Sequence, residues 1–230
     1  GTVVWAHNQY AGRGQGDHTW SSEAGKNLTF SLILYPKFLP ADRQFMLNKA
    51  VSLGILDFAY DSLCLYPEKS RRDRNSRFSM MIKWPNDLYL EHRKAGGVLM
   101  EHRILGNYVA ASVIGIGLNI NQIEFPPDIP NPVSLKILTG HDYNLHEALR
   151  SVCRAIGLRY LMLKSTGGAG LDEEYRSHLL GFGQWLEFTR AEGGSMEGKT
   201  EGVDDLGRLL VLGRDGKTAA YNHQEILYRI

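Results

Sequence analysis

Residues 96–116, GGVLMEHRILGNYVAASVIGI, have the pattern of two β-strands joined by a tight turn. The runs 96–105 and 108–116 are rich in β-branched and aliphatic residues, and Gly106 and Asn107 between them are typical of a hairpin turn. Strands linked by so short a connection pair antiparallel and lie side by side in a sheet. This stretch therefore predicts a hairpin within the main β-sheet of the protein.

Further elements are predicted on both sides of the hairpin. Residues 28–34 (LTFSLIL) place an apolar side chain at every second position, which indicates a half-buried strand, and 78–84 (FSMMIKW) reads as another strand. A helix is expected after Pro40 with Asp42 as its cap, and a second helix is expected to begin at Asn144.

The sequence pattern changes at Gly183. From this residue on, short strand-like segments alternate with turns rich in glycine and aspartate. A β-barrel-like unit of about 45 residues is too small to be stable without packing against a larger body. We therefore expect two domains, a main domain over 1–182 and a small β domain over 183–230.

Composition narrows the classes of function. The 230 residues are 43% hydrophobic and carry a net charge of +1, so the chain can form a core but has no general electrostatic affinity for nucleic acid. The charged run 68–77 is interpreted as a solvated loop. No apolar run approaches the roughly 20 residues that span a bilayer. Two distant cysteines favour a cytoplasmic protein without disulfides. Because Gly1 leads directly into a strand-like run, we expect residues upstream of it.

The segment AGRGQGDHTW, residues 11–20, predicts a ligand-binding loop. Its alternating glycines allow the main chain to approach a ligand closely, and Arg13 can pair with a carboxylate or a phosphate. Trp20 offers an apolar platform for a fused ring. A purely structural glycine-rich turn remains open at this point.

Residues 83–87, KWPND, follow a predicted strand and form the second motif. Pro85 fixes the backbone and disfavours helix at Trp84, so the chain must turn here. A lysine beside a rigid corner holds its ammonium in a defined place, as stabilisation of transition-state charge requires.

The third motif is GIGLNIN, residues 115–121. Gly115 and Gly117 again permit close approach to the backbone, and the amides of Asn119 and Asn121 could read the edge of an adenine. Asparagines that bond their own backbone are an equally acceptable interpretation.

Taken in order, GRG…W, KWPND, RKAGGVL (93–99) and GIGLNIN resemble the biotin protein ligases, and the C-terminal part resembles their SH3-like domain. The resemblance implies an α/β (α+β) fold of the class II synthetase type, with a mixed sheet flanked by helices and a small SH3-like β-barrel. It also implies a monofunctional ligase that uses ATP, biotin and Mg²⁺. Biotin would form biotinyl-5′-AMP, which would acylate a lysine of a biotin carboxyl carrier protein.

The resemblance also implies roles for individual residues. Lys83 and Arg13 would be catalytic, and Asp87 is a candidate magnesium ligand. Biotin is expected against Gln9, Gly12, Arg13, Gly14, Lys83 and Gly97. The nucleotide is expected against Arg13, Gln15, Trp20, Lys83, Asn119 and Asn121. Lys94 is expected to be structural or weakly supportive.

Gln15 departs from the family pattern, which commonly has a second arginine there. A glutamine keeps hydrogen bonding and loses charge, so we expect weaker retention of the adenylate. The alternatives are a lipoate or octanoate ligase or transferase of the same superfamily, and a module that binds biotin or its adenylate without turnover. A free sheet edge would allow either a homodimer or transient pairing with the carrier.

Overall fold

The computed structural model describes residues 1–16, 19–65 and 79–229, so the predicted charged loop at 68–77 and His18 lie outside the described residues. The helices are η1 (Ala41–Arg43, a 3₁₀ turn), α1 (Phe45–Cys64), α3 (Leu135–Thr139), α4 (Leu145–Thr166) and α5 (Leu171–His178). The strands are β1 (Thr2–Ala6), β2 (Gly12–Arg13), β3 (Thr19–Trp20), β4 (Leu28–Leu34), β5 (Met80–Lys83), β6 (Asp87–Leu90), β7 (Arg93–Leu105), β8 (Tyr108–Leu118), β9 (Trp185–Arg190), β10 (Ser195–Val203), β11 (Leu209–Gly213), β12 (Thr218–Tyr221) and β13 (Ile226–Tyr228).

The main sheet has the strand order β1-β4-β8-β7-β6-β5. The predicted hairpin is confirmed as β7 and β8, which turn at Gly106 with a φ of 59°. The expected α/β fold is also confirmed, but the sheet is not mixed, since each of its neighbouring strand pairs is antiparallel. The reason is that β5, β6, β7 and β8 follow one another through short turns, which can join only antiparallel neighbours.

Two of the predicted elements have the predicted bounds. Strand β4 covers residues 28–34, and its four alternating apolar side chains are buried. Helix α4 begins after Asn144, whose side chain accepts hydrogen bonds from the backbone N–H groups of His146 and Glu147. The expected cap at Asp42 is wrong. The 3₁₀ turn over Ala41–Arg43 delays the α-helix to Phe45, where no side chain caps it.

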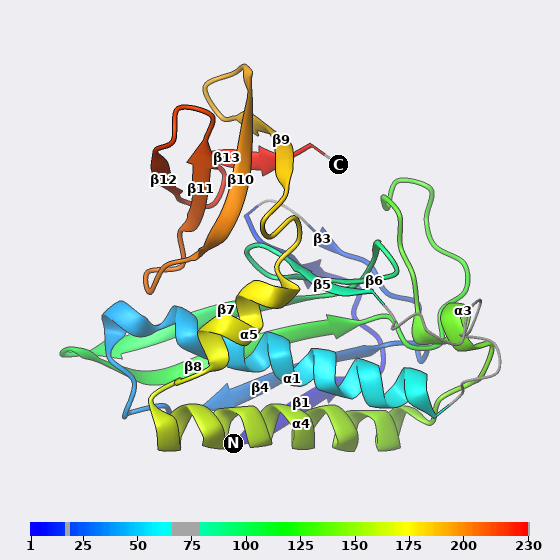
Figure 1. The fold of residues 1–230 in the computed structure, drawn as a ribbon. Coiled ribbons are helices and arrows are strands. Elements are labelled where there is room, and N and C mark those ends of the chain that lie inside the picture. The colour runs from blue at the N-terminus through cyan, green and yellow to red at the C-terminus, as the bar shows by residue number, and fades with distance from the viewer. Residues whose placement is uncertain (17–18, 66–78, 230) are drawn as a thin grey trace.

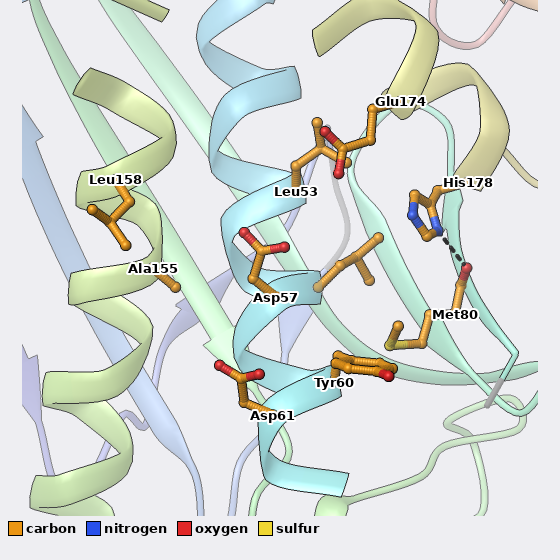
Figure 2. Close-up of a pocket in the computed structure, with 10 residues that line it drawn as sticks. Leu53, Asp57, Tyr60, Asp61, Met80, Ala155, Leu158, Glu174 and His178 are labelled. Atoms are coloured by element: carbon orange, nitrogen blue, oxygen red, sulfur yellow. Dashed lines mark hydrogen bonds between the residues drawn. The ribbon is translucent and has the colours of Figure 1, made fainter. Parts of the chain in front are cut away.

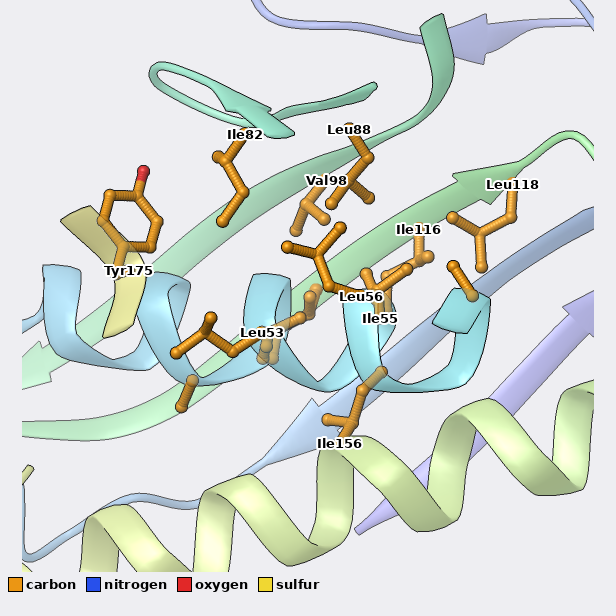
Figure 3. Close-up of a cluster of buried hydrophobic side chains, with 14 of the residues drawn as sticks. Leu53, Ile55, Leu56, Ile82, Leu88, Val98, Ile116, Leu118, Ile156 and Tyr175 are labelled. Carbon is orange, nitrogen blue, oxygen red and sulfur yellow. The ribbon is translucent and has the colours of Figure 1, made fainter. Parts of the chain in front are cut away.

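Helix α1 is buried on most of its surface because it lies against both the sheet and α4 (Figure 1). Figure 3 shows Leu53 and Leu56 of α1 beside apolar side chains of the sheet, with Ile156 of α4 below. The two helices are close together at Gly54, where an added Cβ would lie 2.7 Å from the Cα of Ile156. Among the described residues, no helix is sufficiently long and apolar to cross a membrane.

The C-terminal strands form a five-stranded antiparallel sheet in the order β12-β11-β10-β9-β13. A small β unit is therefore confirmed, but the expected closed barrel is not. Strands β12 and β13 stand at opposite ends of this sheet, and within the described part of the chain they do not pair. The division at 182/183 stays a prediction.

Hydrogen bonds join the C-terminal sheet to the main body. The indole N–H of Trp84 donates to the carbonyl of Gly207 at 2.8 Å. The ammonium of Lys49, which is 1% exposed, donates to the carbonyl of Val203 at 2.9 Å and to Asp172 at 2.5 Å. A buried ammonium and a buried indole are costly without partners, so separating the sheet from the body would be unfavourable.

The two helix-interior glycines at 54 and 157 provide a matched test of this packing. Gly54→Ala should lower the free energy of unfolding by about 1–3 kcal/mol, because the methyl group would force α1 away from α4. Gly157→Ala meets no atom within 4 Å and should raise it by up to about 1 kcal/mol through helix propensity. Urea unfolding measures both, and equal shifts of the same sign would contradict the packing described.

Candidate functional site

A row of cross-strand partners brings three of the predicted site residues together: Lys83, Asp87 and Gly97. Lys83 faces Asp87, Asp87 faces Gly97, Gly97 faces Gly117, and Gly117 faces Thr29. Residues directly opposite each other in an antiparallel sheet project from the same face. Residues far apart in the chain therefore form one line across five strands.

This row lies on the face of the sheet turned away from α1. Side chains alternate along a strand, and the neighbours Val98, Ile116 and Leu118 are buried towards α1 (Figure 3). With glycine at two successive positions of the row, the sheet has a shallow floor where a flat ligand can approach the backbone.

At one end of the row, Lys83 is a half-buried cation without a counter-ion. Lys94 engages Asp87 at 2.7 Å, and no carboxylate among the described residues is within salt-bridge distance of the Lys83 ammonium. The Nζ of Lys83 lies 5.9 Å from the ring centre of Tyr89. Burial lowers the pKa of Lys83, and the charge of Asp87 only partly offsets this. Such an ammonium is well suited to an incoming anion.

The corner predicted at KWPND is present between β5 and β6, with a cis peptide bond between Trp84 and Pro85. The Asn86 amide donates to the carbonyl of Val98 at 2.5 Å, and the Val98 N–H donates to the carbonyl of Asn86 at 2.9 Å. Trp84 is buried. These contacts hold the strand end, and with it Lys83, in a fixed position.

The glycine loop folds as the small β2–β3 ladder, in which Gly12 faces Trp20 and Arg13 faces Thr19. A Cβ on Gly12 would lie 2.3 Å from the carbonyl oxygen of Trp20, so the ladder requires glycine there. The indole of Trp20 lies over Gly117, where a Cβ would come within 2.4 Å of Cε2. Its Nε1 is buried and has no hydrogen-bond partner within the described residues.

The remaining loop residues are close to the same face. Arg13 and Gln9 are exposed, and the Gln9 Oε1 is beside Gly12. Gly14 is half-buried. Gln15 lines a cavity of about 160 Å³ together with residues of the KWPND corner. The loop and the corner therefore meet at this cavity.

Asn119 and Asn121 differ in which atoms of their side-chain amides already form hydrogen bonds within the protein. Both amide atoms of Asn121 are used, since Nδ2 donates to the carbonyl of Tyr143 at 2.8 Å and Oδ1 accepts its N–H at 2.9 Å. Asn119 is buried, and its Nδ2 donates to the carbonyls of Val133 at 3.1 Å and Lys94 at 3.4 Å, whereas its Oδ1 accepts no hydrogen bond among the described residues. An adenine contact by Asn121 would break two hydrogen bonds, so Asn119 is the better candidate.

A magnesium site is not built by these residues. The carboxylate of Asp87 is engaged by Lys94, and the described residues hold no group of three or more His, Cys, Asp or Glu side chains that could bind a metal ion. The sequence-based suggestion that Asp87 is a ligand therefore gains no support.

A larger cavity of about 620 Å³ lies on the helical side, between α1, α4, α5 and the start of β5 (Figure 2). Its carboxylates include Asp57 and Glu174, both of which pair with Arg159. None of the predicted site residues lines it. The larger volume of this cavity is therefore not sufficient reason to assign the functional site to it.

Sequence patterns missed one neighbour of Lys83, the side chain of Tyr89. Lys94, which was expected to be structural or weakly supportive, forms an ion pair with Asp87. Tyr89 could have been found, since it follows Asp87 by two positions on a strand and therefore shares its face.

Comparison with known proteins identifies the family of this chain. The model of the biotin/lipoate A/B protein ligase family matches residues 1–119, about half of the chain. A biotin–[acetyl-CoA-carboxylase] ligase of Paracoccus denitrificans is 30% identical over 93% of this chain and 85% of its own length. The chain belongs to the biotin/lipoate A/B protein ligase family.

The chain is also similar to a solved biotin protein ligase structure and to a bifunctional ligase/repressor. The structure of a biotin protein ligase from Aquifex aeolicus in complex with biotin and ATP superposes with a TM-score of 0.75 at 26% identity, covering 100% of this chain and 89% of that one. The bifunctional ligase/repressor BirA of Bacillus subtilis is 27% identical over 96% of this chain. The chain spans 65% of the length of that relative.

Two glycines of β8 test the contact between the loop and the sheet. Gly117→Ala should displace the Trp20 indole and speed hydrogen–deuterium exchange of the β2–β3 backbone, because the new methyl group overlaps the ring. Gly115→Ala, on the same face, meets its nearest atom only at 3.7 Å and serves as the control. Equal exchange in both variants would show that the indole does not rest on Gly117.

Proposed function

We propose that this chain is an ATP-dependent biotin protein ligase that forms biotinyl-5′-AMP and transfers biotin to a carrier lysine. The observation that carries the proposal is the half-buried ammonium of Lys83, which forms no salt bridge among the described residues and stands at the end of the row that contains Gly97 and Gly117. The names of the relatives support the choice of biotin and ATP as substrates.

In the first step, a carboxylate oxygen of biotin attacks the α-phosphorus of ATP. A new P–O bond forms, the bond to the bridging oxygen breaks, and pyrophosphate leaves. Lys83 would neutralise the charge that grows on the α-phosphate, and Arg13, exposed on the neighbouring loop, would approach the same phosphate. Since Lys83 has no partner to give up, it can act without prior rearrangement.

The glycine loop would protect the product. An acyl adenylate is a mixed anhydride that water hydrolyses, so the site must exclude water until the acceptor arrives. Trp20 over Gly117 gives an apolar wall, and the main chain at Gly12 and Gly14 can approach the ligand. We assign Gln9 and Gly97 to biotin and Asn119 to the nucleotide, with Gln15 near the phosphate.

In the second step, the neutral amine of a carrier lysine attacks the acyl carbon. The C–O bond to phosphate breaks, AMP leaves, and the nitrogen loses a proton as the amide forms. The outer edge of β7 from Leu99 to Leu105 has no strand partner within the described residues. A strand of a biotin carboxyl carrier protein could pair there, as could a second copy of this chain in a homodimer.

Magnesium enters this proposal only as the counter-ion of ATP. No step is assigned to a protein-bound ion, because Asp87 is already paired. We also propose a cytoplasmic location, since Cys64 and Cys153 are both free thiols, as a reducing compartment would keep them.

Replacement of Lys83 by methionine tests the proposal. Lys83→Met retains the apolar stem and removes the charge, so the rate of adenylate formation should fall by about 10²–10³-fold. Lys164→Ala removes an exposed lysine from the last turn of α4 and should leave the rate unchanged. Release of pyrophosphate from ATP in the presence of biotin measures the step.

The mass of the carrier separates the candidate functions. After incubation with ATP, biotin or lipoate, and a carrier domain, the proposal predicts an increase by one biotinyl group. An increase by one lipoyl group would identify the lipoate ligase instead. No increase despite binding of biotin would identify a module that binds without turnover.

A further inference from the structure

The C-terminal sheet places an aromatic ring beside the cation of the candidate site. Tyr228, on β13, has its ring centre 6.0 Å from the Nζ of Lys83. Tyr89, from the main sheet, lies at nearly the same distance, 5.9 Å. Two aromatic rings from different parts of the chain are therefore within range of a cation–π interaction with one ammonium.

The fold holds Tyr228 firmly in this place. It faces Phe188 of β9 across the ladder, and the two ring centres are 5.1 Å apart. Phe188 is fully buried. The next residue, Arg229, donates its N–H to the carbonyl of Glu187 at 3.0 Å and pairs with its carboxylate at 2.9 Å. Ladder, ring contact and ion pair together fix the end of β13.

The sheet that carries Tyr228 is in turn fixed to the site. Trp84, adjacent to Lys83, donates to Gly207 in the turn between β10 and β11. On the other side, Gly16 of the glycine loop abuts the turn between β12 and β13, since a Cβ there would lie 2.9 Å from the Gln224 Nε2. The C-terminal sheet thus touches both the corner and the loop.

The chemistry of Tyr228 suits a positioning role. Burial raises the pKa of its hydroxyl well above the ordinary value, so the ring is neutral and cannot form an ion pair with Lys83. Its hydroxyl is buried and has no hydrogen-bond partner that meets ordinary geometry within the described residues. What Tyr228 offers to Lys83 is therefore its aromatic ring.

We propose that Tyr228 is a positioning residue for Lys83, so that the C-terminal sheet completes the site of adenylate formation. The inference rests on the proposed function. The ring limits the space open to the ammonium and shields it from water, while leaving its charge available to a phosphate. A salt bridge in the same place would consume that charge.

Four groups face Lys83: Asp87 and Tyr89 from β6, Lys94 from β7, and Tyr228 from β13. Burial is the main reason for the lowered pKa of Lys83, while Asp87 acts in the opposite sense and Lys94 in the same sense as burial. Loss of the Tyr228 ring would remove a weak cation–π attraction at 6.0 Å but would also admit water, and because burial is the largest cause of the lowered pKa, the net effect is to raise the pKa of Lys83. Activity that depends on the ammonium would then persist to higher pH.

The test compares Tyr228→Leu with Tyr228→Phe. Tyr228→Leu should lower kcat for adenylate formation about tenfold, with KM for biotin changed less than twofold, and should move the alkaline limb of the pH profile upward. Tyr228→Phe keeps the ring and should restore both properties. Tyr221→Leu removes another tyrosine of the same sheet and should resemble the parent.

Three results would overturn the proposal. They are parent-like kinetics of Tyr228→Leu, an equal loss in Tyr228→Phe, and an equal loss in Tyr221→Leu. Titration of ¹³C-methylated Lys83 by NMR reads its pKa without catalysis. If the parent forms no adenylate, the proposed function fails. A pKa of Lys83 that rises in Tyr228→Leu and not in Tyr228→Phe would still support the placement of the ring. An unchanged pKa of Lys83 in Tyr228→Leu would reject that placement.

Discussion

The ion pair between Lys94 and Asp87 is the interaction on which the rest of the site depends. Lys83 and Asp87 are cross-strand partners, so without Lys94 the carboxylate of Asp87 would be the natural counter-ion of Lys83. Because Lys94 takes that carboxylate, Lys83 is left half-buried and without an ion-pair partner among the described residues, and burial lowers its pKa. The sheet thus separates two lysines into one that balances charge within the protein and one that remains free for a substrate.

The surroundings of Lys83 follow from the antiparallel sheet. The register of its strands sets Lys83, Asp87, Gly97 and Gly117 in one row. The two glycines leave the backbone of the sheet accessible, and the indole of Trp20 covers the backbone at Gly117. The C-terminal sheet closes the other end with Tyr228. A small unit that could have served for packing alone is therefore in contact with the proposed catalytic cation.

Local patterns predicted much of this fold, because they reflect local physics. The alternation in β4, the cap at Asn144 and the β7–β8 hairpin depend on residues adjacent in the chain. The pairing of β4 with β1 and β8 and the open form of the C-terminal sheet depend on contacts between distant segments, which no short pattern encodes. The same reason explains the site. KWPND and the glycine loop were recognisable, whereas the contact of Tyr228 with Lys83 exists only after folding.

A double substitution tests the central ion pair most directly. In Lys94→Met the released Asp87 should pair with Lys83, so the rate of adenylate formation should fall about tenfold, equivalent to about 1.4 kcal/mol. Adding Asp87→Asn removes the competing charge and should restore most of the rate, with Asp87→Asn alone as the control. If Lys94→Met is as active as the parent, or if Asp87→Asn fails to rescue it, Lys94 does not keep Lys83 free, and this account of the site is wrong.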